Sequence, residues 1–294
     1  MAKRQDWVIG IIIAASVLFF LLVLVILLSL SGDLWDAGVG GRKIALIEIE
    51  GTIYSSKSVV RQLKKYSKDS SIPAIVLRIN SPGGGVAASQ EIYEEIKKVR
   101  SKGKKVVASM GSVAASGGYY IAVATDTIVA NPGSVTGSIG VIMASVNAER
   151  LLRKIGVDFE VVKSGKYKDT GSFSRQMTDE ERRLLQGVID DVYDQFVDAI
   201  VSERGISEEE VLSLADGRVF TGRQALQYGF VDILGTYEDA IDITAEMVGM
   251  EKEPRTVKER KRRLRLVDLL VKGLGAEIPG HGRASFSLQY LFPY

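Results

Sequence analysis

The chain has 294 residues, and its 46% hydrophobic and 25% charged residues are typical of a protein that folds around a core. Its formal net charge of +2 gives no indication of a nucleic-acid or polyanionic partner. The sequence has no Cys, which excludes disulfides, thiolate metal sites and a cysteine nucleophile, and one His, His281, near the C-terminus. A hydrolase of this composition is therefore expected to use a base other than His.

The N-terminal region contains one long uncharged stretch, residues 8–31, dominated by Ile, Leu, Val and Phe. As a helix it would reach about 36 Å, enough to span a bilayer. It is longer than the apolar core of a cleavable signal peptide, so an uncleaved signal anchor is favoured, with cleavage as the alternative. Lys3 and Arg4 precede it while Asp33 and Asp36 follow, which predicts a cytosolic N-terminus and an extracytoplasmic working domain.

Predicted strands and helices alternate along the following part of the chain. Nearly continuous apolar runs predict strands, and apolar residues at helical spacing predict helices between them. The strands fall at residues 44–49, 73–80, 106–108, 127–130, 141–146 and 159–162, and the helices at 58–66, 89–100 and 148–155. This alternation predicts an α/β fold with a mainly parallel sheet and flanking helices.

Helices are also predicted in the second half of the chain, where Thr178 with Glu181 and Ser207 with Glu210 form two capping-box patterns. The first pattern opens a long amphipathic helix. Its expected buried stripe is Leu184, Leu185, Val188, Val192, Phe196 and Ile200. Farther on, a basic segment at 251–265 is interpreted as a solvated helix or linker, with contact to anionic lipid as the alternative.

Two loops rich in small residues follow predicted strands, where open α/β sheets place their ligand sites. In residues 80–85, three successive glycines can present backbone N–H groups to a phosphate or an oxyanion, although a plain turn also fits. In residues 111–120, a serine flanked by Ala and Gly can hold its hydroxyl open to a cleft, although close helix packing also explains the small residues. Together the loops could supply the two donors of an acyl-transfer site.

A serine nucleophile needs a base, and lysine is the remaining candidate. A lysine amine has an unperturbed pKa near 10.4, so burial or neighbouring positive charge must favour its neutral form. Lys163, Lys166 and Lys168 follow a predicted strand and are three candidates. Surface charge remains the ordinary explanation for each of them.

Six segments in a fixed order carry a resemblance to a known family. They are Ile49-Glu50-Gly51-Thr52-Ile53, Asn80-Ser81-Pro82-Gly83-Gly84-Gly85, Ala115-Ser116-Gly117-Gly118-Tyr119-Tyr120, Thr136-Gly137-Ser138-Ile139-Gly140-Val141, Lys163-Ser164-Gly165 through Lys168-Asp169, and Asp216-Gly217-Arg218-Val219-Phe220-Thr221-Gly222 through Ala225 and Gly229. Over roughly residues 43–250 the chain resembles signal peptide peptidase A, a family of membrane-anchored Ser/Lys peptidases of the ClpP/crotonase-like superfamily. In its length and its single anchor, the chain resembles the short form of this family.

The resemblance implies a role for five residues. Ser116 matches the nucleophile and Lys168 the general base, which selects one of the three lysines. Gly83 and Gly117 match the oxyanion donors, and Ser138 matches a serine that orients the lysine amine. A hydroxyl beside a buried amine is also physically reasonable, because an unpaired polar group there would be costly. No cofactor and no metal is implied.

The resemblance also implies an activity and an assembly. The chain is expected to be a serine endopeptidase that degrades residual signal peptides in or beside the membrane, as a ring-shaped or dome-like homo-oligomer whose sites could be shared by neighbouring subunits. A crotonase-like acyl-CoA enzyme and a non-catalytic membrane-anchored scaffold that binds lipid or envelope proteins are the alternatives.

The chain is expected to consist of five parts. They are a cytosolic N-terminus (1–7), a transmembrane signal anchor (8–31), a linker (32–42), a peptidase domain (43–250) and a basic, then apolar C-terminal extension (251–294).

The end of that extension, residues 285–294, is itself apolar and peptide-like. It could occupy a cleft or an interface, although chain ends are more often disordered. An apolar cleft would suit extended substrates bound by strand addition.

Overall fold

The computed structural model describes residues 15–21, 23, 41–259 and 289–291, and the chain divides into two units, residues 1–42 and 43–294. In the first unit, residues 15–21 are helical. None of the helices within the described ranges is both long and apolar enough to cross a membrane. Most of the expected anchor at 8–31 lies outside those ranges, as does His281.

The second unit is built on a sheet, of which eight strands lie in the described residues. They are β1 (Ile44–Glu50), β2 (Ala74–Ser81), β4 (Lys105–Ala115), β5 (Thr127–Ala130), β6 (Val135–Gly137), β7 (Val219–Thr221), β8 (Ile233–Leu234) and β9 (Thr256–Lys258). The neighbour order is β7-β6-β4-β2-β1-β9, with β5 beside β4 and β8 beside β5. All pairs are parallel except β6 with β7, which confirms the predicted mainly parallel α/β fold.

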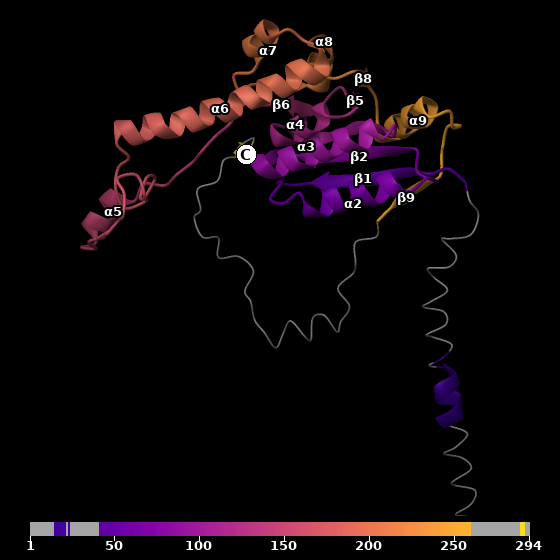
Figure 1. Cartoon of the computed structure of the whole chain (residues 1–294), viewed down its shortest axis with the longest axis horizontal. Helices are drawn as coiled ribbons and strands as arrows, with labels where there is room; N and C mark the ends of the chain where they lie inside the picture. Colours follow the sequence, from indigo (N-terminus) through magenta and orange to yellow (C-terminus); the bar gives the residue numbers. More distant parts are fainter. Residues whose placement is uncertain (1–14, 22, 24–40, 260–288, 292–294) are drawn as a thin grey trace, which may run out of the picture. The chain divides into compact units, whose positions relative to one another are not determined.

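Helices cover both faces of this sheet (Figure 1). They are α2 (Lys57–Lys68), α3 (Val86–Ser101), α4 (Gly117–Val123) and α9 (Tyr237–Met247). The apolar runs of β1 and β2 are nearly continuous because both faces are buried, and Ile47 and Leu77 are 0% exposed. Each such side chain contributes about 1.5–3 kcal/mol through burial. The core thus makes the carboxyl ends of β2 and β4 a rigid platform.

A long helix leads from this core to a projecting segment. The remaining helices are α5 (Glu149–Lys154), α6 (Asp179–Arg204), α7 (Glu208–Leu214) and α8 (Gly222–Gln227). The capping boxes predicted at the starts of α6 and α7 are confirmed. Residues 142–178, which we call the arm, lie with α5 at the far end of α6, away from α4 (Figure 1).

The arm explains where the predicted elements are wrong. No strand forms at 141–146 or 159–162, because these segments lie in the arm and have no sheet to join. Val162 is fully exposed. Leu184 and Val188 at the start of α6 are also exposed rather than buried, whereas the distal half of the predicted stripe, including Phe196, lies in the core.

The C-terminal extension returns to the second unit at two places. β9 pairs in parallel with β1, so the sheet continues past the expected boundary at residue 250. Farther on, β10 (Gln289–Leu291) pairs antiparallel with β3 (Gly83–Gly85) and contacts α4. Most of the expected apolar tail, residues 285–288 and 292–294, lies outside the described residues. The described part forms a strand beside the glycine loop.

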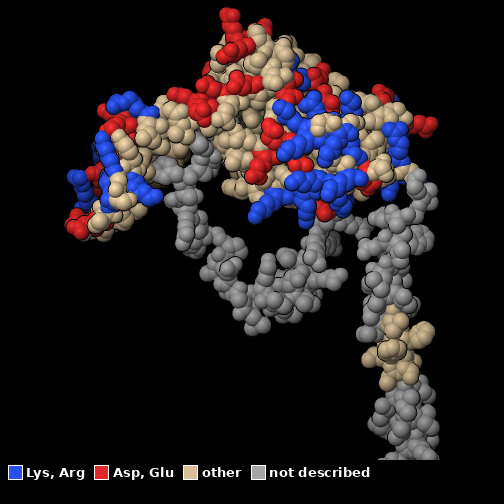
Figure 2. Space-filling view, viewed as in Figure 1, with Lys and Arg blue, Asp and Glu red and all other residues tan. Residues whose placement is uncertain are grey.

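Charge is distributed unevenly over the visible face of the second unit. Figure 2 shows Lys and Arg side chains gathered over α2 and α3, and Asp and Glu side chains around α6 and α7. The small net charge therefore hides local patches of both signs.

Candidate active site

Ser116 lies at a sharp turn between the end of β4 and the start of α4. Its φ is +52°, a conformation that non-glycine residues rarely adopt and that costs on the order of 1–3 kcal/mol. The turn is fixed because the Ser116 N–H donates to Gly137 O at 2.8 Å and the Tyr120 N–H donates to Ser116 O at 2.8 Å. Ser116 is 1% exposed, and its Oγ has no hydrogen-bond partner among the described residues. Such a strained, unpartnered buried hydroxyl indicates a functional site.

The sheet register places Ser138 next to Ser116. Ala115 at the end of β4 pairs with Gly137 at the end of β6, so the two serines are the next residues on adjacent parallel strands. Neighbouring strands lie about 4.8 Å apart. Ser138 is also buried and has a φ of +50°, and its N–H donates to Arg218 O at 2.8 Å. The structure therefore brings together the predicted nucleophile and the predicted lysine-orienting hydroxyl.

The glycine loop approaches the same point from β2. A Cβ on Gly118 would lie 3.0 Å from Ser81 O, so the glycine allows α4 to pack closely against the end of β2. β3 follows directly and contacts α4. Gly117 is the first residue of α4, where N–H groups have no acceptor within the helix. The N–H of Gly117 and the β3 backbone thus lie near Ser116.

The glycine N–H groups of β3 point to two sides. The Gly83 N–H donates to Ser81 Oγ at 3.1 Å, so this predicted oxyanion donor already has a partner. The Gly85 N–H donates to Ile53 O at 2.8 Å. Because N–H groups alternate along a strand, the Gly84 N–H points to the opposite edge, where β10 lies. The resemblance to the family selected Gly83, and the direction of each N–H could be found only from the strand register.

The Gly84 position tolerates no side chain. An added Cβ would lie 2.3 Å from Ile53 O and 2.5 Å from Ile53 N, both of which are backbone atoms. We expect Gly84→Ala to lower the free energy of unfolding by roughly 1–3 kcal/mol and to displace β3. Gly133→Ala is the matched control, because nothing lies within 4 Å of its added Cβ. Equal denaturant midpoints for the two variants would contradict this prediction.

Lys168 lies in the arm and is exposed. No hydrogen bond or ion pair joins its amine to any residue in the described ranges. Because the Ser116 Oγ also has no partner there, the two groups are not in hydrogen-bond contact within one chain. Figure 1 shows the arm well separated from α4. The structure thus groups Ser116, Ser138, Gly83 and Gly117 and leaves Lys168 apart.

A cluster of ion pairs holds the loop that carries Lys168. The Arg175 guanidinium donates to Asp169 Oδ2 and Oδ1, both at 2.9 Å, and to Glu181 Oε2 at 2.9 Å. Lys163 also donates to Asp169. Glu181 is 3% exposed and receives the Thr178 N–H at 2.9 Å as part of the capping box of α6. The cluster therefore fastens the loop to the first turn of α6.

The cluster also sets the ionisation of its acids. Hydrogen bonds from Arg175, and then from Lys163, hold the pKa of Asp169 well below its usual range. Hydrogen bonds from Arg175 and from the Thr178 N–H lower the pKa of Glu181 to about 2. Both carboxylates are thus charged at neutral pH and are compensated by the same guanidinium.

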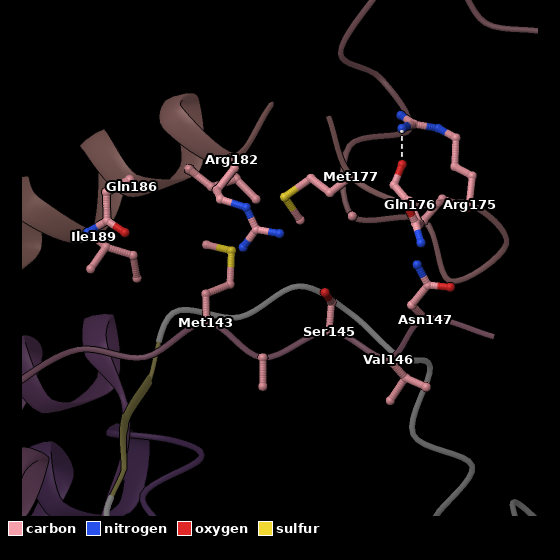
Figure 3. Close-up of a pocket in the computed structure, with 14 residues that line it drawn as sticks. Met143, Ser145, Val146, Asn147, Arg175, Gln176, Met177, Arg182, Gln186 and Ile189 are labelled. Carbon is pink, nitrogen blue, oxygen red and sulfur yellow. Dashed lines mark hydrogen bonds between the residues drawn. The ribbon is translucent and has the colours of Figure 1, made fainter. Parts of the chain in front are cut away.

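A cavity of about 680 Å³ lies between the first turns of α6 and residues 143–147 of the arm. In Figure 3 the side chains of Met143, Met177 and Arg182 point toward one another across it. None of the five predicted site residues lines the cavity. Within the described ranges, no cluster of His, Cys, Asp and Glu could hold a metal ion.

The turn at Ser116, the glycine loop and the parallel sheet define a ClpP-like α/β serine peptidase. A family model for Clp proteases matches residues 39–134, and the model for peptidase family S49 matches residues 98–251. The chain belongs to peptidase family S49 and is of the signal peptide peptidase A type.

Three known proteins are similar to this chain. A Synechocystis sp. protein with a protease name is 50% identical over 214 residues, which cover 72% of this chain and 76% of that protein. An Enterococcus faecium protein named for signal peptide peptidase SppA is 36% identical over 220 residues, covering 70% of this chain and 64% of that protein. The solved structure of a ClpP1 mutant from Listeria monocytogenes has a TM-score of 0.46 at 19% identity and covers 66% of this chain and 93% of its own.

Proposed function

We propose that this serine peptidase is a membrane-anchored endopeptidase with a Ser116–Lys168 dyad. The observation that carries the proposal is the buried, unpartnered Ser116 hydroxyl on a strained turn between a strand and a helix. A serine at such a turn can reach a carbonyl carbon, and the first N–H of the following helix can receive the developing negative charge. The roles of Ser138 and of the lysine come from the resemblance to the family.

The proposed reaction is acyl transfer. The neutral amine of Lys168 takes the Ser116 hydroxyl proton, and the Ser116 oxygen attacks a peptide carbonyl. The N–H of Gly117 and one N–H of the glycine loop stabilise the tetrahedral oxyanion. The orientation of β3 favours Gly84 over Gly83 for this second donor. The lysine then protonates the leaving amine, and water hydrolyses the acyl-enzyme.

The dyad is completed between two copies of the chain. Among the described residues of one chain the Ser116 Oγ has no partner, and Lys168 belongs to the arm. The arm also exposes large apolar side chains, including Val146, Leu151, Ile155 and Phe159, at 54–78%. Exposed apolar surface of this kind is typical of an interface. A homo-oligomer would cover it and bring each arm to the site of a neighbour.

The membrane location rests on the uncharged stretch at residues 8–31 and on the charges that flank it. This anchor would place the peptidase domain outside the cytosol, beside the membrane. Residual signal peptides are apolar segments released into the bilayer by preprotein processing, so they are the substrates that we assign.

Substrates are proposed to bind as an added strand along β3. The chain supplies a stand-in, because Gln289–Leu291 pairs antiparallel with Gly83–Gly85 at the edge to which the Gly84 N–H points. Main-chain hydrogen bonds of this kind recognise extended peptides with little dependence on sequence. The register of β10 thus indicates the direction in which a substrate would lie.

If β10 occupies the substrate position, its removal should expose the site. We expect deletion of residues 285–294 to raise the rate of Ser116 labelling by a fluorophosphonate by about tenfold, because a tethered competitor has a high effective concentration. Tyr290→Pro should act in the same direction, since proline cannot donate to a strand partner. Labelling rates equal to those of the full chain would contradict the strand-addition model.

Hydrolysis of an apolar peptide tests the proposed activity. The full chain in detergent should cleave a quenched fluorescent peptide of signal-peptide composition and should leave an acyl-CoA thioester intact. Turnover of the thioester without peptide cleavage would favour the crotonase-like alternative. Inertness toward both substrates and toward a fluorophosphonate would favour the scaffold.

A further inference from the structure

We propose that Arg175 is a positioning residue for Lys168. Its hydrogen bonds to Asp169 and Glu181, which we call the clamp, hold the loop that carries Lys168 against α6 and keep the Asp169 carboxylate away from the Lys168 amine. This inference rests on the proposed role of Lys168 as the base. Three observations carry it, namely the geometry of the clamp, its partial burial, and the absence of a carboxylate partner for Lys168 in the described residues.

The clamp joins the loop that carries Asp169 to the start of α6, which carries Glu181. Arg175 uses Nε and Nη2 for the two oxygens of Asp169, and its Nη1 donates to Glu181 Oε2. The Asp169 and Glu181 side chains are 12% and 4% exposed, and that of Arg175 is 29% exposed. Thr170 Oγ1 adds a hydrogen bond to Glu181 at 3.2 Å. The residue after Lys168 is therefore fixed to the capped end of a helix that is anchored in the core.

The clamp also controls which cation Asp169 compensates. Asp169 follows Lys168 directly in the chain and is the nearest acid to it in sequence. A carboxylate beside an amine favours the charged ammonium, which cannot accept a proton. Because Arg175 engages both oxygens of Asp169 and Lys163 also donates to this carboxylate, the carboxylate is occupied, and the Lys168 amine has no acid partner among the described residues. A planar guanidinium can bind both oxygens of a carboxylate at once through two N–H groups, a geometry that the ammonium of a lysine does not match.

Several of the other charged groups around the loop have partners of their own. The Lys166 ammonium and the Tyr167 hydroxyl both donate to Glu180 on α6. Glu149 on α5 pairs with Arg153 and accepts the Gln176 N–H. The charged and titratable groups of the loop, of α5, of the segment between them and of the first two turns of α6 are Lys163, Lys166, Tyr167, Lys168, Asp169 and Arg175 on the loop, Glu149, Arg150, Arg153 and Lys154 on α5, Asp158 and Glu160 between them, and Asp179, Glu180, Glu181, Arg182 and Arg183 on α6. Among these acids, Asp169 is the one that adjoins Lys168 in the chain, so it is the acid that we expect the loss of Arg175 to free toward the amine.

The test is the pH dependence of fluorophosphonate labelling at Ser116 in the full detergent-solubilised assembly. In Arg175→Gln, the half-maximal pH should move to higher pH by about one unit, which lowers labelling near neutral pH about tenfold. Arg175→Lys, which keeps the charge but loses the two-pronged contact, should shift in the same direction by less. The double variant Arg175→Gln/Asp169→Asn should return the half-maximal pH to the wild-type position.

A merely structural role predicts a different result. Loosening of the arm alone would lower labelling equally at every pH, and Asp169→Asn would not restore the profile. An unshifted profile in both Arg175 variants would therefore overturn the inference. Lys168→Ala separates this failure from failure of the proposed function: if that variant labels like wild type, Lys168 is not the base, whatever the Arg175 variants do.

Discussion

Replacement of Ser116 by Ala is expected to lower peptide hydrolysis by roughly 10⁴-fold or more, because it removes the proposed nucleophile. The fold should survive this change. The Ser116 Oγ makes no hydrogen bond among the described residues, so its removal leaves no other polar group unpaired. Hydrolysis of the quenched apolar peptide, with thermal unfolding measured in parallel, checks both expectations.

Ser112 supplies the matched control for this variant. It lies on the same strand as the Ser116 turn, four residues earlier in the chain, and is exposed. Ser112→Ala should keep activity within about twofold of wild type, as for surface substitutions generally. A Ser116→Ala chain that still cleaves the peptide at the wild-type rate would remove the nucleophile assignment.

Replacement of Lys168 has the second largest expected effect. Lys168→Ala removes the proposed base, and Lys168→Arg replaces it with a guanidinium that does not lose its proton in proteins. Both variants should therefore lose at least about 10³-fold in activity at neutral pH. Because the Lys168 side chain is exposed and has no partner in the described residues, neither change should alter the unfolding midpoint of the chain.

Lys166 is the control on the same loop. Its ammonium pairs with Glu180 at the surface, and exposed pairs contribute little to stability. Lys166→Ala should thus keep activity within about twofold. If Lys166→Ala and Lys168→Ala lose activity equally, the loop as a whole rather than one amine is responsible, and the choice of Lys168 is wrong.

Much of the fold and the surroundings of Ser116 could be predicted from the sequence. Buried parallel strands appear in a sequence as nearly continuous apolar runs, and a segment of small residues after such a run indicates a tight strand-to-helix turn. The structure has that turn at Ser116 between β4 and α4. The capping boxes at Thr178 and Ser207 are local patterns and were likewise predictable.

The features that the sequence did not predict depend on contacts between distant segments. Apolar residues at 141–146 and 159–162 resemble buried strands, but in a single chain they lie on an exposed arm. A pattern of this kind cannot distinguish a surface buried in the core from one buried in an interface. The N–H directions of Gly83 and Gly84 depend on the pairing of β3 with Ile53 and β10, which no local pattern encodes.

The arm leads to the most direct test of the central claim, that Ser116 of one copy is activated by Lys168 of another. Ser116→Ala and Lys168→Ala chains carrying different affinity tags are coexpressed, and assemblies that contain both are purified by the two tags in succession. Each variant alone should be inactive, whereas mixed assemblies should regain roughly a quarter of wild-type activity, since one random neighbour pair in four then supplies both groups. Mixed assemblies as inactive as either variant would contradict a dyad completed between subunits.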